Sequence, residues 1–231
     1  MTLILERATL VKRYNRFLAD VQKEKDILTV HCPNSGSMKG LSTSGNHVWI
    51  SMSQNPNRKL KHTLEIIEVD GTLVGVNTHR TNQIVKEALE KKEIPNLGSY
   101  DEIHPEISYG SNSRIDFGLK TNNVLHTYIE VKNVTLKDGD YALFPDAPTE
   151  RGTKHILNLM EAKYKGYRAI MFYVIQRSDC KKFSIANMID PLYGETLKKA
   201  VEKGVEVMAY QCHVTPTQIQ LGNSIIIDLD F

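Results

Sequence analysis

The sequence has few cysteines, no long apolar run and little net charge. Its three cysteines, Cys32, Cys180 and Cys212, lie far apart in the 231 residues and form no CxxC pair. This spacing predicts neither a disulfide framework nor a zinc site, and it favours the reducing cytoplasm. No apolar run reaches the ~18 residues of a membrane-spanning helix, so no membrane association is expected. The first residues also lack the pattern of a signal peptide.

The charged residues are nearly balanced, with 29 Lys and Arg against 27 Asp and Glu. Residues 1–78 hold ten of the basic and seven of the acidic residues, so the small basic excess lies in this third of the chain. A difference of this size is also compatible with ordinary surface scatter, and charge alone identifies no nucleic-acid partner. Hydrophobic residues make up 41%, which is enough for a well-packed globular core.

The N-terminal third, residues 1–78, has the pattern of a small β-barrel or sandwich. Short runs rich in β-branched residues alternate with Gly, Pro and Asn turns, and Asp70-Gly71 is a favourable hairpin turn. Six such runs in this length predict a five-stranded, OB-like barrel. The runs are ERATLVKRY, FLADV, ILTVH, HVWISMS, HTLEIIEV and TLVGV.

The pattern changes after residue 78, and residues 79–231 predict an α/β domain with a mixed α+β sheet. Apolar residues recur at helical spacing in TNQIVKEALEKK, three strand-like runs follow, and a second helix is expected from Thr149. The segment RAIMFYVI is almost wholly apolar, as expected for a strand covered on both faces. A further helix and strand follow, and a closing hairpin is expected around Gly222-Asn223.

Two carboxylates and a lysine stand out in the predicted strands. Residues two apart in a strand point to the same face, so Glu130 and Lys132 project together and Val131 points away. Asp116 lies on the preceding strand-like run, and a short hairpin over residues 120–123 joins the two. Antiparallel pairing is therefore expected to set Asp116 beside Glu130.

These three residue types suit the hydrolysis of phosphodiesters. Carboxylate oxygens bind Mg²⁺ or Mn²⁺, which polarises a phosphate and lowers the pKa of a bound water, while a lysine stabilises developing charge. Glu87, at the border of the first helix's apolar stripe, is a candidate for an additional metal ligand. The alternative is a surface ion pair, but the apolar neighbours of Glu130 and Lys132 favour burial, where charges need a partner or a metal.

Basic, aromatic and small polar residues of the barrel are candidates for binding nucleic acid, because OB barrels hold single strands by a basic groove and stacking. The alternatives are barrel core for Tyr14, a solvated loop for residues 58–61, and helix capping with surface polarity for Lys154 and His155. The predicted contacts are Arg13, Tyr14, Arg16, Asn34, Ser35, Lys39, Arg58, Lys59, Lys61, Arg151 and Lys154.

Several stretches along nearly the whole chain resemble the sugar fermentation stimulation protein (SfsA) family. They are RATLVKRYNRFLADV, HCPNSGSM, RKLKHT, VNTHRTNQIVKEAL, SRIDF, YIEVKNVTL and FPDAPTERGTKH. The resemblance implies an N-terminal OB-like domain, a C-terminal PD-(D/E)xK restriction-endonuclease-like domain, and DNA binding. It also implies that Asp116 of SRIDF and Glu130 and Lys132 of EVK form the nuclease site, with Glu87 of KEAL beside them.

Three functions remain to be weighed. The first is a Mg²⁺-dependent nuclease acting on DNA, or on RNA, as a monomer or a homodimer. The second is a DNA-binding regulator of sugar metabolism genes with little or no nuclease activity. A sugar-metabolising enzyme is disfavoured, because the sequence contains neither a sugar-kinase phosphate loop nor a paired-carboxylate glycosidase motif.

Overall fold

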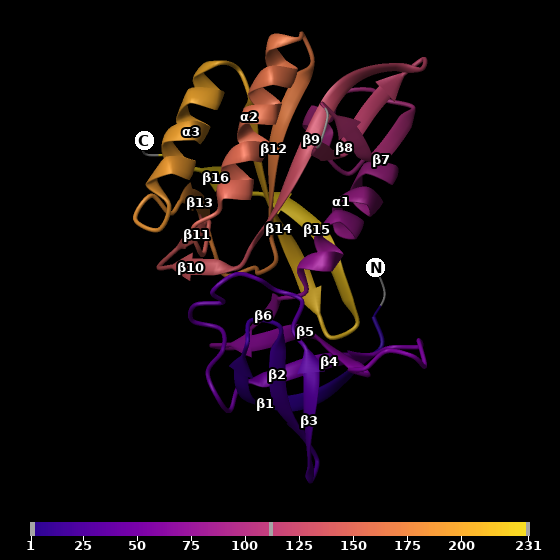
Figure 1. Cartoon of the computed structure of the whole chain (residues 1–231), viewed down its shortest axis with the longest axis vertical. Helices are drawn as coiled ribbons and strands as arrows, with labels where there is room; N and C mark the ends of the chain where they lie inside the picture. Colours follow the sequence, from indigo (N-terminus) through magenta and orange to yellow (C-terminus); the bar gives the residue numbers. More distant parts are fainter. Residues whose placement is uncertain (1–2, 111–112, 230–231) are drawn as a thin grey trace.

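The computed structural model describes residues 3–110 and 113–229, which form a barrel beneath a larger layered α/β region (Figure 1). The barrel closes because β3 pairs with β5 through His31 and Thr63, so that five strands complete a ring. The predicted five-stranded OB barrel is therefore confirmed. Its strands are β1 (Leu5–Tyr14), β2 (Leu18–Lys23), β3 (Asp26–His31), β4 (His47–Met52) and β5 (His62–Val69), and β6 (Thr72–Gly75) extends β5.

The turn between β5 and β6 follows the sequence expectation. Asp70 and Gly71 both have positive φ, at 51° and 75°, and Val69 pairs with Thr72 across them. Positive φ at both central positions is the two-residue turn that matches the twist of a hairpin. Alternate residues of β1 and β2, such as Ala8, Leu10 and Val21, point into the barrel and are buried.

The α/β region is built on a six-stranded mixed sheet in the order β15-β14-β12-β9-β8-β7. The three central strands β9, β12 and β14 are parallel, and the pairings toward both edges are antiparallel. The strands are β7 (Glu102–Tyr109), β8 (Ser113–Thr121), β9 (Val124–Val134), β12 (Arg168–Ile175), β14 (Glu206–Thr215) and β15 (Gln218–Ser224).

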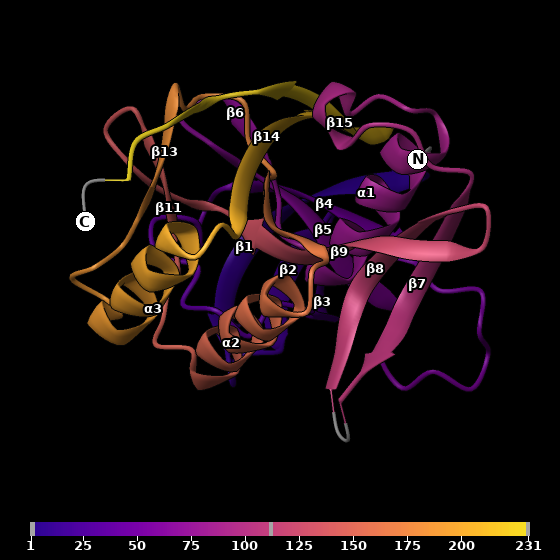
Figure 2. The same cartoon turned by 90° about the horizontal axis from the view of Figure 1, so that it is seen from above.

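Helices cover both faces of this sheet. The helix α1 (Thr81–Glu90) lies on one face, and α2 (Glu150–Tyr164) and α3 (Pro191–Glu202) lie on the other (Figure 2). In β12, Phe172 faces α1 and Tyr173 faces α2 and α3, and both side chains are fully buried. The prediction of a strand covered on both faces is confirmed. Two short 3₁₀ turns, Thr78–Arg80 and Pro95–Leu97, flank α1.

The expected closing hairpin around Gly222-Asn223 is wrong. Both residues lie inside β15, and the chain reverses between Thr215 and Gln218. A Cβ on Gly222 would lie 3.1 Å from the Gln211 carbonyl oxygen, beside the register shift that follows Tyr210. Here glycine allows a close approach at a bulge, and it does not mark a turn.

A small second sheet was not expected from the sequence. Its strands are only two to four residues long, too short for an alternating pattern to be visible. They are β10 (Leu136–Asp138), β11 (Tyr141–Phe144), β13 (Lys182–Ile185) and β16 (Ile226–Ile227). None of the helices in the described ranges is long and apolar enough to cross a membrane.

The barrel and the sheet share one hydrophobic core. Leu3, Trp49 and Ile66 belong to the same buried cluster as α1 and the α1 face of the sheet. Backbone hydrogen bonds also cross the junction, including Gly75 N–H to the Gln176 carbonyl oxygen at 2.8 Å. The two regions are therefore held in a fixed relation by packing as well as by the chain.

Candidate functional site

The row of β9 residues that faces α2 contains two charged side chains. Tyr128 and Val134 of this row are buried in the core beneath α2, whereas Glu130 and Lys132 stand between them. Glu130 is 2% exposed and Lys132 13% exposed, while Val131 points to the α1 side. The alternation predicted from the sequence holds, and it places a carboxylate where an apolar residue would give a continuous core.

Asp116 lies where β8 and β9 separate. The ladder between them ends at the pair Phe117 and Ile129, so Asp116 has no strand partner in β9. Its side chain bonds to β9 in place of its backbone, because Asp116 Oδ2 accepts the Val131 N–H at 2.8 Å. The ladder thus ends one residue before the expected pair of Asp116 and Glu130. The side chain of Asp116 still reaches the backbone next to Glu130.

The helix α1 contributes Asn82, a residue that was not among the predicted site residues. Asn82 Nδ2 donates to Asp116 Oδ1 at 2.7 Å. Asn82 thus holds one oxygen of the carboxylate, and the Val131 N–H holds the other. Glu87 lies more than one turn further along α1, half-buried, and accepts a hydrogen bond from Gln83 at 3.3 Å. Asn82 is therefore the residue of α1 that binds Asp116, and Glu87 as an additional metal ligand stays a prediction.

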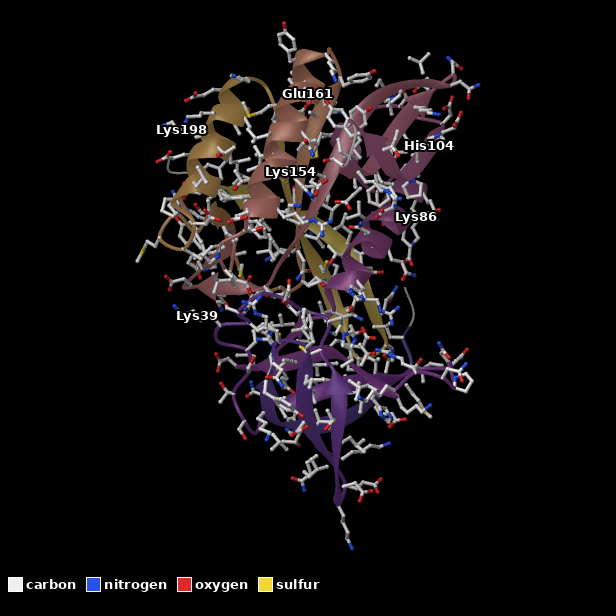
Figure 3. All side chains as sticks on the ribbon, in the orientation of Figure 1. Lys39, Lys86, His104, Lys154, Glu161 and Lys198 are labelled. Carbon is white, nitrogen blue, oxygen red and sulfur yellow. The ribbon has the colours of Figure 1, made fainter. Side chains whose placement is uncertain are left out.

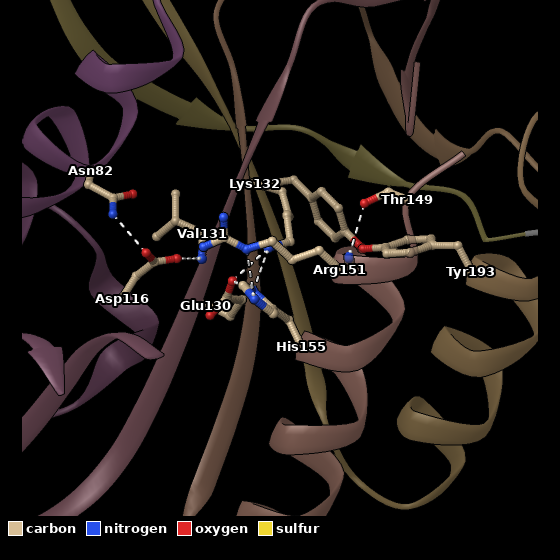
Figure 4. A network of polar contacts seen from close by, with 11 residues as sticks. Asn82, Asp116, Glu130, Val131, Lys132, Thr149, Arg151, His155 and Tyr193 are labelled. Atoms are coloured by element: carbon tan, nitrogen blue, oxygen red, sulfur yellow. Dashed lines mark hydrogen bonds and ion pairs between the residues drawn. The ribbon is translucent and has the colours of Figure 1, made fainter. Parts of the chain in front are cut away.

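Glu130 is bound by two cationic or cation-forming side chains (Figure 4). Lys132 Nζ donates to Glu130 Oε1 at 2.6 Å, and His155 Nδ1 contacts the same oxygen. Arg151 Nε donates to His155 Nε2 at 3.3 Å, which assigns the hydrogen of a neutral ring to Nδ1, toward Glu130. Lys132 Nζ and His155 Nδ1 are themselves 3.1 Å apart, so the three groups form one cluster.

The first turns of α2 fix the position of this cluster. Thr149 caps the helix by accepting the Gly152 N–H at 3.0 Å, and Asp190 accepts the Thr149 N–H at 2.8 Å. A Cβ on Gly152 would lie 3.1 Å from the ring of Tyr193, so glycine allows this end of α2 to pack closely. His155 and Arg151 are thereby held on the side of the helix that faces β9.

The pKa values of the two carboxyl groups are shifted in opposite directions. Burial, and then the charge of Glu130, raises the pKa of Asp116 despite its hydrogen bonds from Val131 and Asn82. Burial also disfavours ionised Glu130, but hydrogen bonds and charge from His155 and Lys132 outweigh it and lower the pKa of Glu130. Neighbouring acids with such divergent environments are typical of functional sites.

Two open clefts meet at this cluster. The interdomain cleft, about 660 Å³, is lined by Arg16, Asn34 and Ser35 of the barrel and by Lys132 and Arg151 of the α/β region. The second, which we call the α2 cleft, is about 680 Å³. It is lined by Glu106, Ser108, Gly110, Ser113, Arg114, Arg151, Lys154 and His155.

Five of the predicted nucleic-acid contacts therefore line a cleft at the catalytic candidates: Arg16, Asn34, Ser35, Arg151 and Lys154. Arg13 instead holds the barrel loop that lines the interdomain cleft, because its guanidinium donates to the carbonyl oxygens of Asn34, Gly36 and Ser37.

The other predicted contacts lie outside the lining of both clefts. The Tyr14 hydroxyl donates to Asp20 at 2.9 Å, Arg58 contacts the His31 ring at 3.1 Å, and Lys61 donates to the Pro56 carbonyl oxygen. Lys59 is exposed. Lys39 is also exposed, on the side of the barrel nearest the α/β region, while Lys154 lies above it on α2 (Figure 3).

Sequence reasoning underrated three residues of the site. His155 was considered only as a weak phosphate contact, and its place is set by how α2 packs on β9. Asn82 carried no signal beyond its position in the first turn of α1. Asp146 Oδ2 accepts the Met38 N–H at 3.1 Å and ties the α/β region to the barrel loop, a contact between distant segments that local sequence does not indicate.

The fold and the site together define the class of protein. A closed OB barrel is joined to a mixed sheet, and two carboxylates and a lysine lie where two strands of that sheet separate. The protein combines an OB domain with a PD-(D/E)xK, restriction-endonuclease-like domain. The family model described as "Sugar fermentation stimulation protein RE domain" matches residues 79–218, and that described as "SfsA N-terminal OB domain" matches residues 11–76. The chain belongs to the SfsA family.

Individual proteins agree with this assignment. A sugar fermentation stimulation protein homolog of Geobacter metallireducens is 51% identical over 215 residues, which cover 92% of each chain. One of Geotalea uraniireducens is 48% identical over 215 residues, 93% of each chain. The structure of Pyrococcus furiosus SfsA in complex with Ca²⁺ is similar with a TM-score of 0.88 at 25% identity, covering 99% of each chain.

Proposed function

We propose that the protein is a divalent-metal-dependent nuclease that acts on DNA. In this proposal residues 1–78 hold the nucleic acid and residues 79–231 cut it. The observation that carries the proposal is the cluster of Asp116, Glu130 and Lys132 at the meeting point of two open clefts, with a barrel loop forming one wall. Buried carboxylates with divergent pKa values beside a lysine fit catalysis better than they fit a structural ion pair.

The carboxylates fit Mg²⁺ or Mn²⁺ by their chemistry. Asp116 and Glu130 offer hard oxygen donors on neighbouring strands. They are only two, because the described part of the chain contains no group of three or more His, Cys, Asp or Glu arranged to hold a metal. Two carboxylates suffice for Mg²⁺, because this ion keeps several waters and takes further ligands from phosphate. A Ca²⁺-bound relative of similar fold supports a divalent site in the family. A bound ion supplies Lewis acidity toward the phosphate and a water of lowered pKa.

The protein's own residues then have distinct roles. Asn82 and the Val131 N–H orient Asp116, so both of its oxygens are fixed before a ligand arrives. Lys132 lies next to Glu130 and lines the interdomain cleft, where its charge stabilises negative charge that develops on the phosphate. Arg151 orients His155, and His155 in turn holds Glu130.

One observation favours the rival, a DNA-binding regulator without cleavage. Lys132 and His155 already contact Glu130, so the carboxylate has partners without any metal. A protein that had lost its activity could keep this arrangement for stability. The two candidates share the same clefts and differ only in whether the phosphodiester bond is broken.

The decisive experiment incubates purified protein with labelled single- and double-stranded DNA and RNA in Mg²⁺, Mn²⁺ or EDTA. Lys132→Ala removes the lysine at the cluster, and Lys198→Ala, on the far helix α3, removes an equal charge outside both clefts (Figure 3). We expect metal-dependent cleavage that is lost in Lys132→Ala and kept in Lys198→Ala. Salt-sensitive binding with no cleavage in either metal would replace the nuclease by the regulator.

A further inference from the structure

The candidate catalytic cluster lies between two clefts and not at the closed end of one. Lys132 lines the interdomain cleft, His155 lines the α2 cleft, and Arg151 lines both. Because Lys132 and His155 are 3.1 Å apart and Arg151 lines both clefts, the two clefts adjoin at this cluster. The two volumes, about 660 and 680 Å³, are nearly equal, so similar room is available on either side.

Both clefts carry positive charge that is accessible to a phosphate backbone. Arg16 lies in the interdomain cleft, and Arg114 and Lys154 lie in the α2 cleft. Arg114 is paired with Glu106 at 3.4 Å, but their side chains are 69% and 60% exposed, and an exposed pair of this kind is weak. A phosphate can therefore compete for Arg114. Cations on both sides of the cluster suit a strand that continues past the cleavage point in both directions.

Two loops that line the interdomain cleft touch each other. Asp146 accepts the Met38 N–H at 3.1 Å, and a Cβ on Gly36 would collide with the Asp146 carboxylate. The barrel loop and the loop before α2 are thus joined beside the cleft, and a duplex would have to part them. A flexible single strand fits this passage without such a movement, and small polar groups such as Asn34 and Ser35 line it.

We propose that one continuous single strand runs through the interdomain cleft, over the cluster and out along the α2 cleft. This inference rests on the proposed function and specifies its substrate. Because neither side of the cluster is closed, cleavage needs no free end, and the enzyme is an endonuclease of single strands.

The first test compares a circular single-stranded DNA with its linearised form and with the double-stranded circle, in Mg²⁺ and in Mn²⁺. We expect the single-stranded circle to be cut at a rate within about threefold of the linear strand, and the duplex circle to be cut at least about tenfold more slowly. Shortening of the linear strand from its ends with an intact circle would overturn the inference and leave the proposed nuclease standing. Equal cutting of the duplex circle would overturn the single-strand assignment. No cleavage of any substrate would overturn the proposed function itself.

The second test measures binding without metal, by fluorescence anisotropy in EDTA, so that it does not depend on catalysis. A double variant Arg114→Ala/Lys154→Ala removes the cations of the α2 cleft, and Lys86→Ala/Lys198→Ala removes two exposed cations elsewhere. For oligothymidylate of about 20 nucleotides, long enough for both clefts, we expect about tenfold weaker binding and a salt slope lower by about 1–2. For one of about five nucleotides, within the site size of a single OB fold, we expect a change below about twofold. Equal losses for both lengths would show that the α2 cleft is not the exit path.

Discussion

Within residues 3–110 and 113–229, two glutamates are almost completely buried, one in each region. Glu65 of the barrel strand β5 is 1% exposed and Glu130 of β9 is 2% exposed. Glu65 accepts hydrogen bonds from Ser51 at 2.6 Å, from Asn77 at 2.8 Å and from both Nε and Nη2 of Arg80. Its two oxygens are thus shared among fixed donors on β4 and on the segment from Asn77 to Arg80 that joins the barrel to α1.

Glu130 has a different set of partners. Lys132 and His155 both contact Oε1, and both side chains reach it from the margins of open clefts. A carboxylate whose oxygens are satisfied by fixed donors can only hold the fold together. A carboxylate held through one oxygen by groups at a cleft can exchange those partners for a ligand. Burial alone therefore does not distinguish a structural charge from a functional one, whereas the arrangement of partners does.

The largest expected effect is a difference in cleavage rate between two single variants, Glu130→Gln and Glu65→Gln. Glu130→Gln should lower metal-dependent cleavage by about 10³-fold, because a neutral amide neither binds the ion strongly nor keeps the local charge pattern. Glu65→Gln should leave cleavage within about threefold wherever the protein is folded. Rates of single-turnover cleavage on one labelled strand measure both, and a similar loss in both variants would remove the proposed distinction.

The next effect concerns stability. Arg80→Ala leaves Glu65 as a buried charge with only neutral donors, and we expect a loss of about 3–5 kcal/mol in the free energy of unfolding. Lys132→Ala should cost clearly less, because Glu130 keeps its contact with His155, which lines the open α2 cleft. Urea denaturation followed by circular dichroism gives both values. Adding Glu65→Gln to Arg80→Ala should recover part of the loss, and failure to do so would show that the charge of Glu65 is not its cause.

The smallest effect is a gain in stability at Asp116. Burial and the charge of Glu130 raise the pKa of Asp116 in the folded state, so the folded protein keeps this proton to a higher pH than the unfolded chain. The stability that the group contributes is therefore complete below the unfolded pKa of about 3.9 and is lost as pH rises through the folded pKa. Asp116→Asn avoids that loss and should stabilise the protein by roughly 0.5–2 kcal/mol at pH 7.

The pH dependence provides the control for this prediction. Below about pH 4 the wild-type carboxyl is protonated in both states, so the gain from Asp116→Asn should vanish. Thermal unfolding in EDTA at several pH values measures the difference. A gain that is constant with pH would assign the effect to packing and not to ionisation. The same variant should be inactive, which would show that the carboxylate needed for cleavage lowers the stability of the fold.

Much of this architecture was predictable because it depends on periodicity. The two-residue period of strands placed Glu130 and Lys132 on one face, and Asp70-Gly71 specified its turn. The order of the three helices and of the main-sheet strands from β7 to β14 followed from the same patterns, whereas the short strands of the second sheet did not. What escaped prediction depends on contacts between distant segments: the end of the β8–β9 ladder at Phe117, the approach of His155 from α2, and the contact of Asp146 with the barrel loop.

Gly222 is a case in which local sequence predicted a turn that the structure does not have. Beside Asn223 it has the composition of a turn, yet the bulge in β14 needs a residue without a side chain opposite it. Local sequence reports which conformations a residue tolerates, and only the neighbouring strand decides which of them is used.

The core shared by Leu3, Trp49 and Ile66 with α1 and the sheet bears on how the chain can be divided. The two family models meet between residues 76 and 79, which is a boundary in sequence. Apolar packing ignores that boundary, and a barrel cut out at residue 78 would present Trp49 and Ile66 to water. We therefore expect one cooperative melting transition for the whole chain and poor solubility for either half alone. Recombination between relatives at this boundary would succeed only where the apolar side chains from the two parents still pack together across it.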